Sequence, residues 1–172
     1  MEININEVKE NANNKEYILE KVKQVGKTLE FAAPELQDDE EVVKEAVRQD
    51  GEALEFASDR LKGSKDIVML AIQTAPWTAF YASEKLKADK ELILASVKDC
   101  GQTLYYASEE LRDDEDVVRA AVTNKGIIIK YASQRLRNNK EIAKIAIGQN
   151  KGAYHFLTEE LKKDEEIKGL IS

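Results

Sequence analysis

Apolar and polar positions alternate with helical spacing along most of the chain, and the same alternation returns every 25 residues. Leucine recurs at this interval at Leu36, Leu61, Leu86, Leu111, Leu136 and Leu161. An aromatic residue recurs at Phe31, Phe56, Tyr81, Tyr106, Tyr131 and Phe156. A fixed period of this length predicts a repeat protein in which each unit is one supersecondary element.

The unit that spans residues 104–128 shows which helices one repeat contains. Leu104, Ala107 and Leu111 lie at the 1, 4, 8 spacing of a single helix face. The segment from Val117 to Val122 is apolar over more than half of a helix circumference, so neighbouring units must cover it on two sides. We therefore expect a short helix, a tight helical turn that ends at the leucine, and a longer helix in each unit.

Capping residues predict where these helices begin and end. The tight turn should start after Ser58, Ser83, Ser108, Ser133 and Thr158, and Pro34 marks the same point one repeat earlier. The longer helix should start after Asn14, Asp39, Ser64, Asp89, Asp114, Asn139 and Asp164. It should end at the C′ residues Gly26, Gly51, Gly101 and Gly126, with Pro76 in the same place in the third unit.

Four consecutive acids, Asp113 to Asp116, have the composition of a metal loop or an acidic active site. Every unit, however, has an acid two residues after the N-cap position: Glu16, Glu41, Asp66, Glu91, Asp116, Glu141 and Glu166. Acids in the first turn of a helix are favoured by the helix dipole, by about 0.3–1 kcal/mol each. Because a catalytic or metal site would occur only once, we interpret the acids as helix caps.

These patterns predict an all-α fold, an α-solenoid with a right-handed superhelix of about seven 25-residue helical repeats in one domain, 1–172. Residues 4–28 form an N-terminal capping repeat, since Asn6 and Asn11 replace the aromatic residue and the leucine. Residues 29–153 form five full repeats, and residues 154–172 form a truncated C-terminal capping repeat.

The stretch ASEELRDDEDVVRAAVTNKG, repeated in phase, resembles the repeats of the domain of unknown function family 4116, which read roughly LxxASxxLRDDxEVVLxAVxxxG. The resemblance is strongest over residues 29–153. It implies a helical repeat fold, and it implies no reaction and no catalytic residue. A more distant likeness is to leucine-rich repeat variants, and those that bind an iron–sulfur cluster use a group of cysteines that this chain lacks.

Composition and charge narrow the classes of function. A net charge of −7 disfavours nucleic acid as a partner, and the single cysteine fits a reducing compartment. The start of the chain has no leader-like pattern and no run is long enough for a membrane span. We expect a cytoplasmic protein without a membrane, while export without a leader stays open.

No pattern of catalytic or ligand-binding residues stands out. His155 and Cys100 are single and fall in different units, without a partner at a recognisable spacing. Paired carboxylates occur in every unit, and no glycine-rich phosphate loop is present. We expect no enzyme activity, no catalytic residue, no cofactor and no metal.

Two rows of side chains have alternative interpretations. The aromatic row is either a core ladder between repeats or an exposed stacking platform, and its uniformity favours the core. The basic row, Lys62, Lys87, Arg112, Arg137 and Lys162, has the spacing to follow phosphates. It lies four residues before the acidic row, and we expect the two rows to neutralise each other.

The residues that break the repeat are the best candidates for a binding site. Trp77 and Ile127 occupy a position where other units have Lys27, Glu52 and Gln102. Three residues further on, Phe80 and Tyr105 replace polar residues. On the longer helix, Met69 and Leu94 replace Lys44, Arg119 and Lys144. An exposed apolar patch is typical of an interaction site, although repacking between units could also bury these side chains.

We therefore expect a non-enzymatic protein- or peptide-binding scaffold that is a monomer or a weak homodimer. A solenoid that binds nucleic acid or another anion, an enzyme accessory domain, and a spacer without a ligand are the alternatives.

Overall fold

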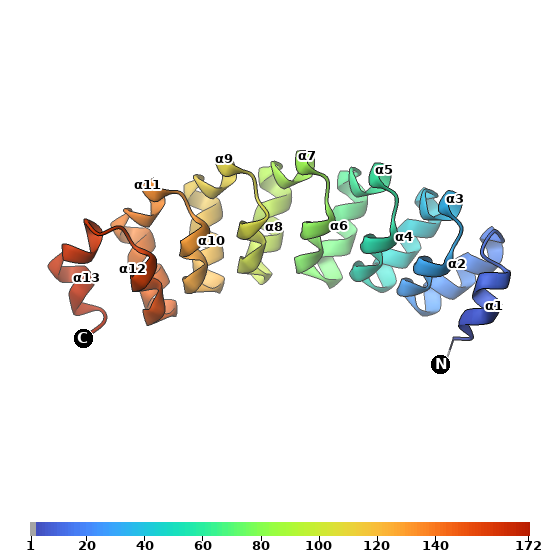
Figure 1. The fold of residues 1–172 in the computed structure, drawn as a ribbon, viewed down its shortest axis with the longest axis horizontal. Coiled ribbons are helices and arrows are strands. Elements are labelled where there is room, and N and C mark those ends of the chain that lie inside the picture. Colours follow the sequence, from blue (N-terminus) through green and yellow to red (C-terminus); the bar gives the residue numbers. More distant parts are fainter. Residues whose placement is uncertain (1–2) are drawn as a thin grey trace. The chain divides into compact units, whose positions relative to one another are not determined.

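The computed structural model describes residues 3–172, and within them the regular structure is α-helix and 3₁₀-helix, without strands (Figure 1). Contacts between residues divide the chain into two compact units, an N-terminal unit that ends at Leu86 and a C-terminal unit, Lys87–Ser172. No helix of the described chain is long and apolar enough to cross a membrane.

The N-terminal unit begins with α1 (Ile5–Glu10) and α2 (Lys15–Gln24). Two repeats follow, each with a 3₁₀-helix, a short α-helix and a long α-helix: η1 (Gly26–Phe31), α3 (Pro34–Gln37) and α4 (Glu40–Gln49), then η2 (Gly51–Phe56), α5 (Asp59–Lys62) and α6 (Lys65–Thr74). The 3₁₀-helix η3 (Pro76–Tyr81) comes next, and the boundary between the units falls inside α7 (Glu84–Lys87).

The C-terminal unit has the same order of elements. It contains α8 (Lys90–Asp99), η4 (Gly101–Tyr105), α9 (Glu109–Arg112), α10 (Glu115–Asn124), η5 (Gly126–Tyr131), α11 (Gln134–Arg137) and α12 (Lys140–Gln149). The last repeat is reduced to η6 (Lys151–Phe156), η7 (Leu161–Lys163) and α13 (Glu165–Gly169). Long helices that are neighbours in sequence pack together within each unit, as do neighbouring 3₁₀-helices, and the short helices of each unit lie along one edge of that unit (Figure 1).

These elements confirm the predicted all-α repeat fold, with one difference. The first helix of each full repeat is a 3₁₀-helix, and the sequence did not distinguish it from an α-helix. It spans five or six residues, and extended residues flank it in repeats such as that of η2, where they are Asp50 and Ala57. Segments this short are typical of 3₁₀-helices, whose i and i+3 side chains eclipse each other.

The predicted starts of the longer helices are confirmed. All seven predicted residues are N-caps of the long helices or of α13, from Asn14 before α2 to Asp164 before α13. The Asp114 carboxylate, for example, accepts hydrogen bonds from the backbone N–H groups of Asp116 and Val117. Ser64 occupies its N-cap position without a side-chain hydrogen bond. The acidic run therefore starts a helix, as its recurrence predicts.

The core lies between the long helices and the turns that precede them. Val117, Val118, Ala121 and Val122 of α10 are fully buried. The whole leucine row is buried as well, at Leu36, Leu61, Leu86, Leu111, Leu136 and Leu161. This burial confirms that the long helix is covered by neighbouring repeats, which is the source of stability in a repeat array.

Glycine follows the long helix for a reason other than the one predicted. No glycine of residues 3–172 has a positive φ, so a left-handed C′ conformation is absent there. A Cβ on Gly126 would instead lie 2.1 Å from the Ala146 carbonyl oxygen of the next repeat. The Gly126 N–H also donates a 2.6 Å hydrogen bond to the Gln149 side chain. Gly26, Gly51 and Gly101 make the same close approach and the same type of hydrogen bond.

In three repeats the acids at the start of the long helix pair with a lysine of the preceding repeat, and the prediction that the basic row neutralises them is wrong. The Lys90 ammonium lies 2.8 Å from both Asp114 and Asp116, one repeat further along the chain. Lys15 contacts Asp39 and Glu41 in the same way, and Lys140 contacts Asp164 and Glu166. Arg112 and Lys162 of the basic row pair instead with Glu109 and Glu159, three residues earlier. The partners of the acids are 24 and 26 residues away, beyond the reach of local patterns.

Candidate functional site

The 3₁₀-helices of the N-terminal unit carry two large exposed rings. Trp77 and Phe80 of η3 are three residues apart, so they share one face of the 3₁₀-helix. Their exposed fractions are 50% for Trp77 and 42% for Phe80. Both side chains that the sequence singled out in this helix therefore face solvent in this unit.

Glu52 connects Trp77 to the two preceding 3₁₀-helices. The indole Nε1 of Trp77 donates a 3.2 Å hydrogen bond to Glu52 in η2, and the Lys27 ammonium in η1 forms an ion pair with the same carboxylate. The hydrogen bonds from Lys27 and Trp77 hold the pKa of the Glu52 carboxyl below its usual value, despite partial desolvation. Glu52 is thus an ionised group that fixes the indole against the neighbouring repeat.

A second carboxylate, Glu55, lies one turn further along η2. Burial, together with the Glu55 carboxylate, raises the pKa of Tyr81 to about 12. The rings of Tyr81 and Phe80 are 4.5 Å apart between centroids. Glu55 itself is exposed, as is Glu30 at the equivalent position in η1.

We call this surface of the N-terminal unit the acidic–aromatic face. It consists of Glu30, Glu52, Glu55, Phe56, Trp77, Phe80 and Tyr81. The sequence did not single out Glu52 or Glu55. Glu52 and Glu55 can be found from the sequence because they lie 25 residues before Trp77 and Phe80. Residues at the same position of neighbouring repeats lie side by side.

The C-terminal unit carries two exposed tyrosines, Tyr105 at the end of η4 and Tyr106 directly after it. The exposed fractions are 52% for Tyr105 and 38% for Tyr106. The Tyr105 ring lies edge-on to Tyr106, with centroids 4.8 Å apart, and its centroid is 4.7 Å from that of Tyr131. Ile127, the other candidate in this unit's 3₁₀-helices, is half-buried.

The aromatic row as a whole is at the surface, so the prediction that it forms a core ladder is wrong. Tyr106 is exposed, and the other five members are half-buried: Phe31, Phe56, Tyr81, Tyr131 and Phe156. Lysine side chains partly cover some of these rings: the Lys130 ammonium lies 4.7 Å from the ring centroid of Tyr131 and 5.9 Å from that of Phe156. The leucine row and the alanines beside it fill the core instead.

Met69 and Leu94, on the long helices, are half-buried. Leu94 lines an open pocket of about 550 Å³ in the C-terminal unit, formed by α8 and α10 with Lys98, Asp116, Arg119, Ala120, Thr123 and Asn124. Met69 lies on α6 of the N-terminal unit. These two residues therefore expose less apolar surface than the rings of the 3₁₀-helices.

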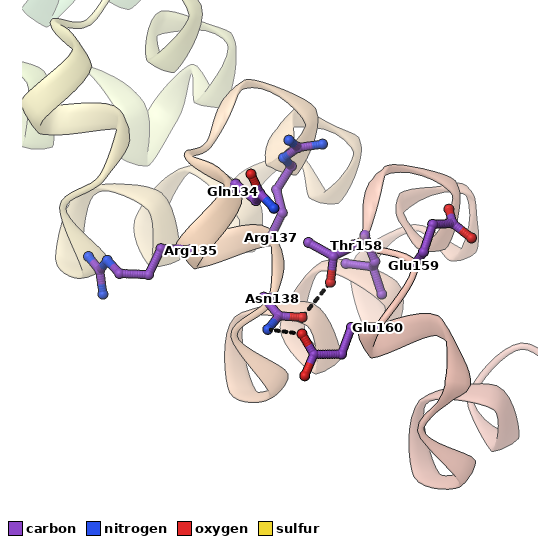
Figure 2. A pocket seen from close by; sticks show the side chains of 8 residues that line it. Gln134, Arg135, Arg137, Asn138, Thr158, Glu159 and Glu160 are labelled. Atoms are coloured by element: carbon purple, nitrogen blue, oxygen red, sulfur yellow. Dashed lines mark hydrogen bonds between the residues drawn. The ribbon is translucent and has the colours of Figure 1, made fainter.

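A larger open pocket, of about 860 Å³, lies between α11 and the segment that precedes η7 (Figure 2). Its polar groups bind one another. Asn138 receives a hydrogen bond from the Thr158 hydroxyl and donates one of 3.2 Å to Glu160, while Glu159 pairs with Lys162. The side chains of Arg135 and Arg137 point in different directions from α11 (Figure 2). The pocket thus presents no converging set of polar groups.

The remaining candidates for chemistry are isolated. Cys100 is a half-buried free thiol at the end of α8, and His155 is exposed in η6, with its ring centroid 6.2 Å from that of Tyr154. Residues 3–172 contain no group of three or more histidines, cysteines or acids placed to hold a metal ion. In the basic row, the buried Nε atoms of Arg112 and Arg137 lack a hydrogen-bond acceptor, and the two arginines hold the same repeat position.

A family model described as a domain of unknown function, DUF4116, matches the chain in five overlapping segments: residues 14–62, 39–87, 64–112, 89–137 and 114–162. Each match begins at the N-cap residue of a long helix and ends at the basic residue of a short helix. Together the matches cover residues 14–162. No curated protein and no solved structure matches the chain.

Proposed function

The chain belongs to the DUF4116 family of helical repeats, and from the surface of its 3₁₀-helices we propose that it is a non-enzymatic scaffold that binds a protein or peptide partner. The observation that carries this proposal is the exposure of Trp77 and Phe80 side by side on one helix face. Tryptophan is among the residues that most often dominate the binding energy of protein interfaces. Contiguous exposed apolar surface is typical of interaction sites.

Comparison between repeats supports the same proposal. At the two positions of Trp77 and Phe80, the earlier repeats of the unit have Lys27 and Glu30, then Glu52 and Glu55. The fold therefore does not require apolar residues at these positions. In the C-terminal unit, Tyr105 is exposed at the position of Phe80, while the half-buried Ile127, Met69 and Leu94 are secondary members of the proposed binding surface.

The proposal includes a cytoplasmic location and a monomeric or weakly dimeric state. A free thiol at Cys100, without a second cysteine in the sequence, is compatible with a reducing compartment. The exposed rings cover too small a surface to imply an obligate dimer, whose interfaces bury about 2,000 Å² or more.

The proposal is tested with Trp77→Ala/Phe80→Ala in the full chain. We expect this variant to keep the far-ultraviolet circular dichroism and melting temperature of the wild type, because neither ring is in the core. Proteins cross-linked to the wild type in its native cells should be absent from the variant. Ile5→Ala is the control, since Ile5 is equally exposed in the same unit and lies on α1. Identical partners and oligomeric state for the folded double variant and the wild type would overturn the proposal.

A further inference from the structure

We propose that the acidic–aromatic face binds a basic peptide segment, which places a lysine or arginine side chain against the rings of Phe56 and Tyr81, next to the carboxylates of Glu30 and Glu55. This inference rests on the proposed function and names the chemistry of the partner.

The C-terminal unit shows how this fold accommodates a lysine on its aromatic row. The Lys130 ammonium lies over the ring of Tyr131, in its own repeat, and over that of Phe156, in the next. Contacts of this kind are attractive because the face of an aromatic ring carries partial negative charge. The N-terminal unit has a further case, in which the Lys9 ammonium of α1 is 5.4 Å from the Phe31 ring centroid.

The middle of the N-terminal unit has the rings without the lysine. Glu30 and Glu55 occupy the repeat position of Lys130, so carboxylates stand where the C-terminal unit has its ammonium. Within residues 3–172, no lysine or arginine lies over the ring of Phe56 or Tyr81, the two members of the aromatic row that correspond to Tyr131 and Phe156. The aromatic row here is open to a cation from another molecule.

The charges of this face favour a cation as well. Glu52 is already neutralised by Lys27. Glu30 and Glu55 are exposed, and neither forms an ion pair within the described chain. The Tyr81 hydroxyl beside Glu55 keeps its proton at neutral pH, because its pKa is raised to about 12, and therefore adds no charge to this face. A cation over the rings would therefore meet two carboxylates that form no ion pair within the described chain, and aliphatic side chains next to it in the peptide would cover Trp77 and Phe80.

The length of a lysine or arginine side chain suits such a surface. Its methylene groups can pack on the exposed rings while the charged group stays at the level of the carboxylates. Charge complementarity of this kind also raises the rate of association and selects against acidic partners.

The test uses the full chain as bait for a phage-displayed library of random dodecapeptides. We expect the selected peptides to be enriched in lysine or arginine next to apolar residues. Affinity is then measured with the selected peptides in synthetic form, from the fluorescence anisotropy of a dye on the peptide, because the variant without Trp77 has no tryptophan of its own. Glu30→Gln/Glu55→Gln should weaken binding by about tenfold, and raised salt should weaken it further.

Because the protein has a net charge of −7, any basic peptide is attracted to it, and a control must match this charge. Glu16→Gln/Asp66→Asn removes the same two charges in the first turns of α2 and α6. These turns lie about 15 Å from the helix ends that lead into the 3₁₀-helices, at 1.5 Å per residue. We expect this control to change the affinity by less than about twofold, as weakly coupled, screened charges do.

Two results separate the failure of this inference from the failure of the proposed function. Selected peptides that lack basic residues but lose binding in Trp77→Ala/Phe80→Ala would overturn the inference and leave the proposed function standing. Equal effects of the two charge variants would also overturn the inference. Two further results would overturn both the inference and the proposed function. They are that no peptide is enriched, or that the enriched peptides bind the Trp77→Ala/Phe80→Ala variant as well as the wild type.

Discussion

The indole of Trp77 is held by Glu52, which occupies the same position one repeat earlier, through a 3.2 Å hydrogen bond from Nε1 to the carboxylate. This bond restricts the orientation of an exposed ring. A ring whose orientation is already restricted loses less conformational entropy when a partner binds. The repeat array thus presents a pre-oriented anchor, although the position tolerates charged residues in the other repeats of the same unit.

The close approach at the repeat junctions predicts that glycine is required there. We expect Gly126→Ala to lower the free energy of unfolding by about 1–3 kcal/mol, because the new Cβ overlaps a backbone carbonyl that has no freedom to move away. Gly148→Ala is the control: Gly148 lies inside α12, and a Cβ added there would have no neighbour within 4 Å, so alanine should raise stability by about 0.5–1 kcal/mol. Urea denaturation followed by circular dichroism measures both. Equal effects of the two substitutions would show that the junction is not close-packed.

If Asp114 in the acidic run acts as a helix cap, its substitution by alanine and its substitution by asparagine should have different effects on stability. Asp114→Ala should lower stability by about 0.5–2 kcal/mol, whereas Asp114→Asn should have a smaller effect, since asparagine also caps helices. Asn139 does so in a later repeat, where it accepts hydrogen bonds from Glu141 and Ile142. Thermal melts with and without millimolar calcium provide the control. A melting temperature that rises with calcium in the wild type but not in Asp114→Asn would instead indicate a metal site.

The ionised Asp113 carboxylate should stabilise the fold at neutral pH, and this contribution should be lost in acid. Hydrogen bonds from the Ser133 hydroxyl and from Arg135 hold the pKa of the Asp113 carboxyl below its ordinary value of 3.8. A lowered folded-state pKa contributes stability above the unfolded value, and the contribution is lost as the pH falls through the folded value. We expect Asp113→Asn to melt below the wild type at pH 7, and the difference to shrink as the pH drops below about 4. A difference that is constant between pH 7 and pH 2 would contradict the ionic role.

Tyr81 should titrate at a higher pH than a tyrosine in water. Burial and the Glu55 carboxylate raise the pKa of Tyr81 to about 12. Because an unfolded tyrosine ionises near 10, this group lowers the stability of the fold as the pH rises from about 10 to about 12. In an ultraviolet titration of the six tyrosines, Tyr81→Phe should remove a late phase, and Glu55→Gln should move that phase to lower pH. An unchanged late phase in Glu55→Gln would show that the two groups are not in contact.

Much of the fold follows from the sequence because its signals are local and recur. The N-cap residues, the buried leucine row and the apolar long helices occupy the predicted positions. When similar residues recur at the same position of several repeats, the structural role of that position can be inferred from each repeat separately. The family match to residues 14–162 covers the same repeats.

The features that sequence did not predict depend on residues about one repeat apart. The requirement for Gly126 comes from the Ala146 carbonyl, 20 residues further on. The charge of Asp114 is balanced by Lys90, 24 residues earlier. The side chain that orients Trp77 is 25 residues before it. Such partners become visible only when equal positions of neighbouring repeats are compared.

The candidate site was predicted in part for the same reason. Polar residues in sister repeats indicated that Trp77, Phe80 and Tyr105 occupy solvent-facing positions, and all three are exposed. The same comparison gave no measure of how far Ile127 is covered by its neighbours, and this side chain is half-buried. The binding role of these residues stays a prediction.

The central claim is that the acidic–aromatic face binds a peptide, and the footprint of a bound peptide on the full chain tests it most directly. Amide and indole chemical shifts of the ¹⁵N-labelled protein are recorded while a library-selected peptide is added. We predict that the largest changes occur at the Trp77 indole N–H and at the backbone amides of Glu52, Glu55 and Phe80. Changes that cluster instead on the long helices around Met69, or around the pocket beside Arg137, would contradict the claim.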